Sequence, residues 1–159
     1  MKIFLGTDHA GYELKEKLKD FLGDLGYDVE DRGAFELDPN DDYPDFISLV
    51  AKEVSQNPES RGIVLGGSGQ GEAICANRFP NVRASVFYGP PSHKPSEGQA
   101  DPFEIIKLSR EHNDANILSL GSRFLSEEEA KKSVKLWLET DFSGDDRHVR
   151  RIKKLEANI

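Results

Sequence analysis

Short apolar runs alternate with longer amphipathic stretches along the whole chain. The apolar runs end at glycine or polar residues and predict five strands, at residues 3–5, 27–31, 63–65, 82–87 and 117–120. Apolar residues spaced three or four apart predict helices between them, at residues 14–25, 46–54, 72–78, 103–111 and 126–138, followed by a basic helix over 145–156. No hairpin signal joins consecutive strands. The pattern therefore predicts an α/β protein, with a five-stranded parallel sheet covered by helices on both faces.

The chain has 159 residues, which predicts one domain spanning residues 1–159. A stretch rich in proline and glycine predicts a loop insertion at 88–102, and the basic stretch 145–159 predicts a C-terminal helical arm. The net charge of −8 disfavours nucleic acid and anionic membranes as partners. Cys75 is the only cysteine, which excludes an intrachain disulfide. No apolar run approaches 18 residues, so the expected location is the cytoplasm.

The loop after the third expected strand is the most informative motif. It reads Gly66-Gly67-Ser68-Gly69-Gln70-Gly71 and leads into a helix that begins near Glu72. Four glycines in six residues let the backbone turn sharply and aim its N–H groups at one point, and the helix N-terminus favours an anion there. Glu72 stands where a phosphate-binding loop carries lysine, so the motif favours an oxyanion-stabilising loop with Glu72 as the neighbouring base. There are two structural alternatives: the loop is a plain tight turn, and Glu72 is a first-turn glutamate that is merely favoured by the helix dipole.

Asp8 and His9 follow the first expected strand, at the same sheet edge as the glycine-rich loop. A histidine there could contact a phosphate or a sugar hydroxyl, whereas the structural alternative is that Asp8 caps the next helix. His112, Asn113 and Asp114 precede the fifth strand and so belong to the opposite, amino edge of the sheet. They are expected either to serve a neighbouring subunit's site or to form only a cap or turn.

Arg147 and Arg151 are four residues apart and share one face of the basic helix, which suits them to grip a phosphate. A solvated helix and a nucleic-acid arm are the alternatives. The four histidines, at positions 9, 93, 112 and 148, lack the spacing of metal ligands. No metal or other cofactor is therefore expected, and Cys75 is interpreted as a packing residue.

Taken together and in this order, the motifs resemble the type B ribose-5-phosphate isomerases and the related galactose-6-phosphate isomerase subunits. The resemblance covers nearly the whole chain. It rests on the segments 6–12, 14–15, 42–44, 66–72, 76–77, 110–116 and 121–123 and on Arg147, His148 and Arg151. It implies a Rossmann-like α/β/α sandwich and a homodimer or a tetramer with active sites at the subunit interface. It also implies a metal-free aldose–ketose isomerisation of a sugar phosphate through an enediolate.

The resemblance also implies a role for each candidate residue. One branch of the family has a cysteine base at the position of Gly66, and this chain resembles the other branch, in which Glu72 is the base. The implied catalytic residues are Glu72, Ser68 and His112, with His112 opening the sugar ring from the partner subunit. The implied substrate-binding residues are Asp8, His9, Gly67, Gly69, Gln70, Gly71, Asn113, Arg123, Arg147 and Arg151.

Three functions are compatible with these motifs. The first is interconversion of ribose 5-phosphate and ribulose 5-phosphate. The second is isomerisation of a six-carbon substrate, allose 6-phosphate or galactose 6-phosphate, because pocket depth sets the chain length. The third is a non-catalytic sugar-phosphate sensor. The stretch 88–102 is about ten residues longer than the usual family connection and could alter substrate preference or assembly.

Overall fold

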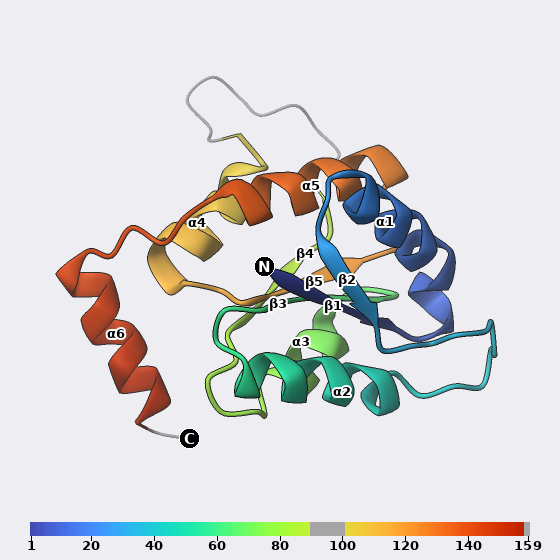
Figure 1. Cartoon of the computed structure of the whole chain (residues 1–159), viewed down its shortest axis with the longest axis horizontal. Coiled ribbons are helices and arrows are strands. Elements are labelled where there is room, and N and C mark those ends of the chain that lie inside the picture. Colours follow the sequence, from blue (N-terminus) through green and yellow to red (C-terminus); the bar gives the residue numbers. More distant parts are fainter. Residues whose placement is uncertain (90–100, 158–159) are drawn as a thin grey trace.

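Five parallel strands form the centre of the computed structural model, which describes residues 1–89 and 101–157. The strands are β1 (Lys2–Thr7), β2 (Asp28–Asp31), β3 (Arg61–Gly66), β4 (Ala84–Phe87) and β5 (Ile117–Gly121). Their order across the sheet is β2-β1-β3-β5-β4, and every neighbouring pair is parallel (Figure 1). The parallel five-stranded sheet predicted from the apolar pattern is confirmed.

Helices cover both faces of this sheet. On one face lie α1 (Tyr12–Asp24), α4 (Glu104–Asn113) and α5 (Glu127–Glu139), and on the other lie α2 (Tyr43–Gln56) and α3 (Gln70–Ala76) (Figure 1). A short 3-10 turn, η1 (His9–Gly11), joins β1 to α1. The three-layer α/β/α sandwich is therefore confirmed. No helix in the described part of the chain is long and apolar enough to span a membrane.

The core consists of two apolar clusters, one on each face of the sheet. Ile3 and Leu5 of β1 point into one cluster, with the fully buried Trp137, whereas Phe4 points into the other, with Val50. This alternation follows from the two-residue period of a strand. Because both faces are covered, the central strands read as continuous apolar runs.

The last helix, α6 (Asp146–Glu156), stands apart from the sandwich and packs on the end of α4 (Figure 1). Arg83, just before β4, anchors it: Nη1 lies 2.7 Å from the Glu156 carboxylate, while Nε donates to the carbonyl oxygens of Asn113 and Asp114, both at 3.0 Å. This confirms the C-terminal helical arm.

Several element boundaries differ from those predicted, and two of these shifts have an identifiable cause. Helix α2 begins at Tyr43, three residues before its apolar stripe, because Pro44 fits the first turn, where no N–H partner is needed. The fourth strand begins at Ala84 instead of residue 82. The Asn77 side chain bonds both backbone groups of Ala84, so residues 77–83 form a loop. Most of the expected insertion at 88–102, with His93, lies outside the described residues.

We expect Ser126 to contribute measurably to stability, because it forms a capping box at the start of α5. Its side chain accepts from the backbone N–H of Glu129, and the Glu129 carboxylate accepts from the backbone N–H of Ser126. Ser126→Ala should lower the free energy of unfolding by about 1 kcal/mol. Thermal unfolding should show this as a Tm about 2–4 °C lower. Ser126→Asp restores a capping oxygen and should recover most of the loss; equal losses in both variants would contradict this role.

Candidate active site

The glycine-rich loop crosses the carboxyl end of β3 and is held against β5. Gly69 adopts a left-handed conformation (φ 77°), and a Cβ there would come within 3.1 Å of the backbone of Leu120 and Gly121. Ser119 fixes this approach, because its hydroxyl donates to the carbonyl oxygen of Gly69 at 2.7 Å. Glycine is therefore required at position 69 both for its conformation and for space.

Glu72 lies in the first turn of α3, and its carboxylate is folded back over Gly66. A Cβ on Gly66 would overlap the Glu72 carboxylate. The carboxylate therefore occupies the space that a side chain at position 66 would need. Glu72 is only 4% exposed. Burial raises its pKa, and the negative charge of Asp8 raises it further, against hydrogen bonds from the backbone N–H groups of Glu72 and Gly69. A partly desolvated carboxylate of this kind is the state that a general base requires.

Asp8 and His9 reach the same edge from the end of β1. Asp8 is buried and accepts a hydrogen bond from the backbone N–H of Ala10 at 3.0 Å, which makes it the cap of η1. The structural alternative for Asp8 is thus realised, yet its charge is also felt by Glu72. One residue both shapes the turn and acts on the candidate base.

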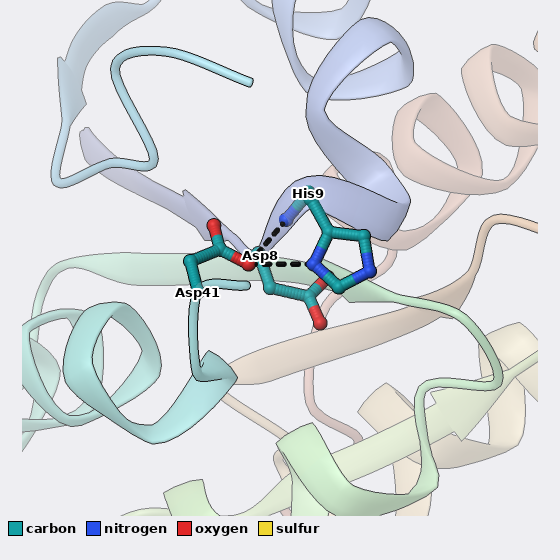
Figure 2. Close-up of side chains that lie close together, drawn as sticks. All are labelled: Asp8, His9 and Asp41. Carbon is teal, nitrogen blue, oxygen red and sulfur yellow. Dashed lines mark hydrogen bonds and ion pairs between the residues drawn. The ribbon is translucent and has the colours of Figure 1, made fainter. Parts of the chain in front are cut away.

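His9 is oriented by Asp41, a residue for which the sequence predicts no role. The Asp41 oxygen Oδ1 lies 2.6 Å from His9 Nδ1 and 3.0 Å from its backbone nitrogen (Figure 2). The hydrogen bond to Asp41 raises the pKa of His9 and the charge of Asp8 raises it further, whereas burial and the charge of Arg123 oppose the rise. Because Nδ1 faces Asp41, the other ring nitrogen, Nε2, is left for a ligand. No spacing pattern distinguishes Asp41 from its acidic neighbours in the 33–43 loop.

Asp8, His9 and Asp41 also bring three ligand-type atoms within 4.8 Å of one another, which is close enough to consider a metal ion. Two donor atoms of one ion stand roughly 3 Å apart at ordinary bond lengths and angles. The 2.6 Å between His9 Nδ1 and Asp41 Oδ1 is shorter and is close to the distance of a charge-assisted hydrogen bond. The geometry of this pair therefore fits a hydrogen bond better than a pair of metal ligands.

The loop after β5 completes this edge. A Cβ on Gly67 would lie 3.2 Å from Cζ of Arg123, so the guanidinium covers the start of the glycine-rich loop. Ser122 donates to the carbonyl oxygen of Gly66 at 2.5 Å or to that of Ala10 at 3.0 Å, which ties the ends of β1, β3 and β5 together. Tyr43 packs so closely on Gly71 that a Cβ there would lie 2.9 Å from its ring. Tyr43 and Ser122 lie in segments that carry the family resemblance, 42–44 and 121–123, but the sequence predicts no role for either.

The remaining candidate residues gather at the opposite edge of the sheet. His112 and Asn113 end α4, before β5 begins, and the ring of His112 stacks on His148 of α6, the helix that carries Arg147 and Arg151. The five residues of β5 alone span about 16 Å. One chain therefore brings Asp8, His9, Glu72, the glycine-rich loop and Arg123 together, but it does not bring the amino-edge group to them.

Cys75 takes no part in either group. Its sulfur lies 3.5 Å from the Ser48 hydroxyl, and it packs against the apolar cluster under α2. This agrees with its interpretation as a packing residue.

A family model and related sequences match nearly the whole chain and indicate the same family. The model of the family described as Ribose/Galactose Isomerase matches residues 3–155. A relative from Mycolicibacterium paratuberculosis, named ribose-5-phosphate isomerase B, is 39% identical over 152 residues, covering 96% of this chain and 87% of its own.

Solved structures agree in fold as well as sequence. Ribose-5-phosphate isomerase B from Mycoplasma genitalium, with bound ribulose-5-phosphate, superposes with a TM-score of 0.88 at 35% identity, covering 99% of this chain and 95% of its own. The corresponding protein from Clostridium thermocellum gives 0.87 at 40% identity, with 99% and 97% covered. With a family model spanning nearly every residue and close relatives in both sequence and fold, the chain belongs to the ribose/galactose isomerase family.

Proposed function

We propose that this protein interconverts ribose 5-phosphate and ribulose 5-phosphate, with Glu72 as the base that moves a proton between C2 and C1. The observation that carries the proposal is the buried Glu72 carboxylate with its raised pKa, set beside a backbone loop at the carboxyl edge of the sheet. The printed names of the relatives, and the ribulose-5-phosphate in the Mycoplasma genitalium structure, support this substrate pair.

The proton transfer needs a base and a stabilised oxyanion. The Glu72 carboxylate takes the C2 proton of the open-chain aldose, the electron pair moves toward the C1 oxygen, and an enediolate forms. Glu72 then returns the proton to C1, which leaves the ketone at C2. Glu72 returns to its charged form, so no external reactant is consumed.

The glycine-rich loop supplies donors for the enediolate. The N–H of Gly69 bonds the Glu72 carboxylate, and that of Gln70 donates to the Ser68 hydroxyl at 3.3 Å. We therefore assign the enediolate oxygen to the amides of Gly67, Ser68 and Gly71, with the Ser68 hydroxyl moving protons between the two substrate oxygens. Gly69 and Gln70 hold the base and the hydroxyl in place, which is narrower than the role expected for them.

The phosphate requires cationic partners in an acidic protein. His9, whose protonated form Asp41 stabilises, and Arg123 lie at this edge, and we assign both to the substrate's phosphate and sugar hydroxyls. We assign Arg147 and Arg151 of a second copy to the phosphate, and the second copy's His112 and Asn113 to ring opening and to the sugar chain.

We infer a homodimer from the separation of the two groups, because in the proposed site the amino-edge residues must come from another copy. Large exposed apolar side chains on the covering helices, Leu49 of α2 and Ile74 of α3, support an interface near the glycine-rich loop. We further infer that the enzyme acts in the cytoplasm as one domain without a cofactor. A six-carbon substrate is the second candidate, because the same edge groups serve either chain length.

Glu72→Gln should abolish isomerisation, because an amide cannot accept the C2 proton. We expect turnover of ribose 5-phosphate to fall by at least about 1,000-fold while the Tm changes little. The measurement is the initial rate of ribulose 5-phosphate formation, with allose 6-phosphate run in parallel. Cys75→Ser is the matched control and should keep nearly full activity.

The outcomes separate the three candidate functions. Turnover of ribose 5-phosphate by the wild type that is lost in the Glu72→Gln variant supports the proposal. Turnover of the hexose alone keeps Glu72 and changes the substrate. Binding of the sugar phosphates without turnover by the wild type would identify a sensor and overturn the enzymatic proposal.

The acid limb of the pH–rate profile should report Glu72. Burial and the charge of Asp8 raise the pKa of Glu72. As the pH is lowered, kcat/KM should therefore begin to fall at a higher pH than it would with a glutamate of ordinary pKa, because the base becomes protonated. Asp8→Asn keeps the cap of η1 but removes the charge, so the acid limb should move to lower pH. Asp42→Asn makes the same charge change on an exposed side chain and should leave the limb in place; a limb unmoved by Asp8→Asn would exclude this coupling.

Mixed dimers provide the test for a shared site. Glu72→Gln and His112→Gln chains should each be nearly inactive with ribose 5-phosphate. After unfolding and refolding together, half of the dimers are hybrids in which one of two sites has both native residues. Activity should therefore return to about a quarter of the wild-type value. If both residues acted within one chain, the mixture would stay as inactive as its components.

A further inference from the structure

The ring of His112 stacks on the ring of His148 of α6. The two ring centroids lie 4.3 Å apart and the planes are inclined by 13°, which is a flat stack. His148 is only 3% exposed, whereas His112 is partly exposed. In the described ranges, 1–89 and 101–157, no hydrogen bond or ion pair reaches the His112 ring. The stack is therefore the contact that orients it.

The backbone that carries His112 is fixed independently of α6. Asp114 ends α4 in a left-handed conformation (φ 44°), and its N–H donates to the carbonyl of Arg110 at 2.9 Å. Arg110 in turn bonds the Asp114 carboxylate at 2.7 Å and the Ala115 carbonyl at 2.7 Å. The α4 terminus thus places the Cα of His112, and what remains free is the orientation of its ring.

The surroundings of His148 suit a ring that stays uncharged. Arg147 Nε donates to His148 Nε2 at 3.2 Å, which places the proton of the neutral ring on Nδ1. Burial lowers the pKa of His148, the charges of His112, Arg147 and Arg151 lower it further, and Asp145, 3.9 Å away, opposes them. A neutral ring can lie flat against an imidazole that gains and loses a proton, without a second positive charge beside it.

We propose that His148 is a positioning residue, which holds the His112 imidazole flat and aims its exposed nitrogen at the sugar ring of the substrate in the neighbouring subunit's site. The inference rests on the proposed function, in which His112 opens the furanose. Ring opening breaks the C1–O4 bond, removes the proton of the C1 hydroxyl and adds one to O4, which leaves the C1 aldehyde. An imidazole moves such a proton only when its nitrogen lies within hydrogen-bonding reach at the correct angle.

The two substrates separate this step from the rest of the reaction. Ribose 5-phosphate is largely a closed furanose and must be opened. Ribulose 5-phosphate cannot form a five-membered ring, because its C5 oxygen carries the phosphate. A fault confined to ring opening therefore slows the aldose direction and spares initial turnover of the ketose, whose open-chain aldehyde product closes in solution.

The experiment compares His148→Leu and His148→Gln, which lose the flat ring, with His148→Phe, which keeps it. Leu and Gln should lower kcat for ribose 5-phosphate by about 10- to 100-fold, with KM and the initial rate from ribulose 5-phosphate within about twofold of wild type. Phe should stay within about threefold in both directions. A thermal melt of each variant reports on folding.

Three results would overturn the inference. Equal losses in both directions, or a rise in KM, would show that His148 only anchors the helix bearing Arg147 and Arg151. Unchanged aldose turnover with Leu and Gln would show that the stack does not orient His112. A Phe variant as slow as Leu would show that ring flatness is not the property that matters. Failure of the proposed function is separate, since it would appear as wild-type protein that does not convert ribose 5-phosphate.

Discussion

The direction of the strands is the constraint on which the rest of this structure depends. In a fully parallel sheet all carboxyl ends meet at one edge, so the loops after β1, β3 and β5 converge there without further design. Asp8, the glycine-rich loop and Arg123 are neighbours for this reason alone. The same constraint sends the end of α4 to the other edge, so the proposed site, which draws on both edges, needs a second copy of the chain.

Each edge has its own anchoring residue. At the carboxyl edge Ser122 binds the carbonyls of Gly66 and Ala10, so strands that are distant in sequence present their loops in a fixed relation. At the amino edge Arg83 joins the end of α4 to the end of α6. The C-terminal helical arm is therefore held by more than its covalent connection to α5. It is attached at both ends, by the stacked histidines near its start and by Glu156 at its close.

Sequence patterns predicted the parts of the molecule that follow from local spacing. The five strands and the opposite placement of Glu72 and His112 follow from periodicity and connectivity. Asp41 and the His112–His148 stack could not be found this way, because each depends on a partner that only the tertiary fold brings near. The early start of α2 was missed because Tyr43 and Pro44 precede the apolar stripe. The spacing of Arg147 and Arg151 left a phosphate grip, a solvated helix and a nucleic-acid arm open, and only the resemblance to the family favoured the phosphate.

The overlap between a side chain at position 66 and the carboxylate of Glu72 also limits how such enzymes can change by mutation. A cysteine introduced at Gly66 would have to displace the buried carboxylate, so neither residue could occupy its working position. Removing Glu72 first would leave a chain without the base that we propose for it. The two positions are therefore epistatic: an evolutionary route between a glutamate and a cysteine base must change both together or pass through an inactive protein.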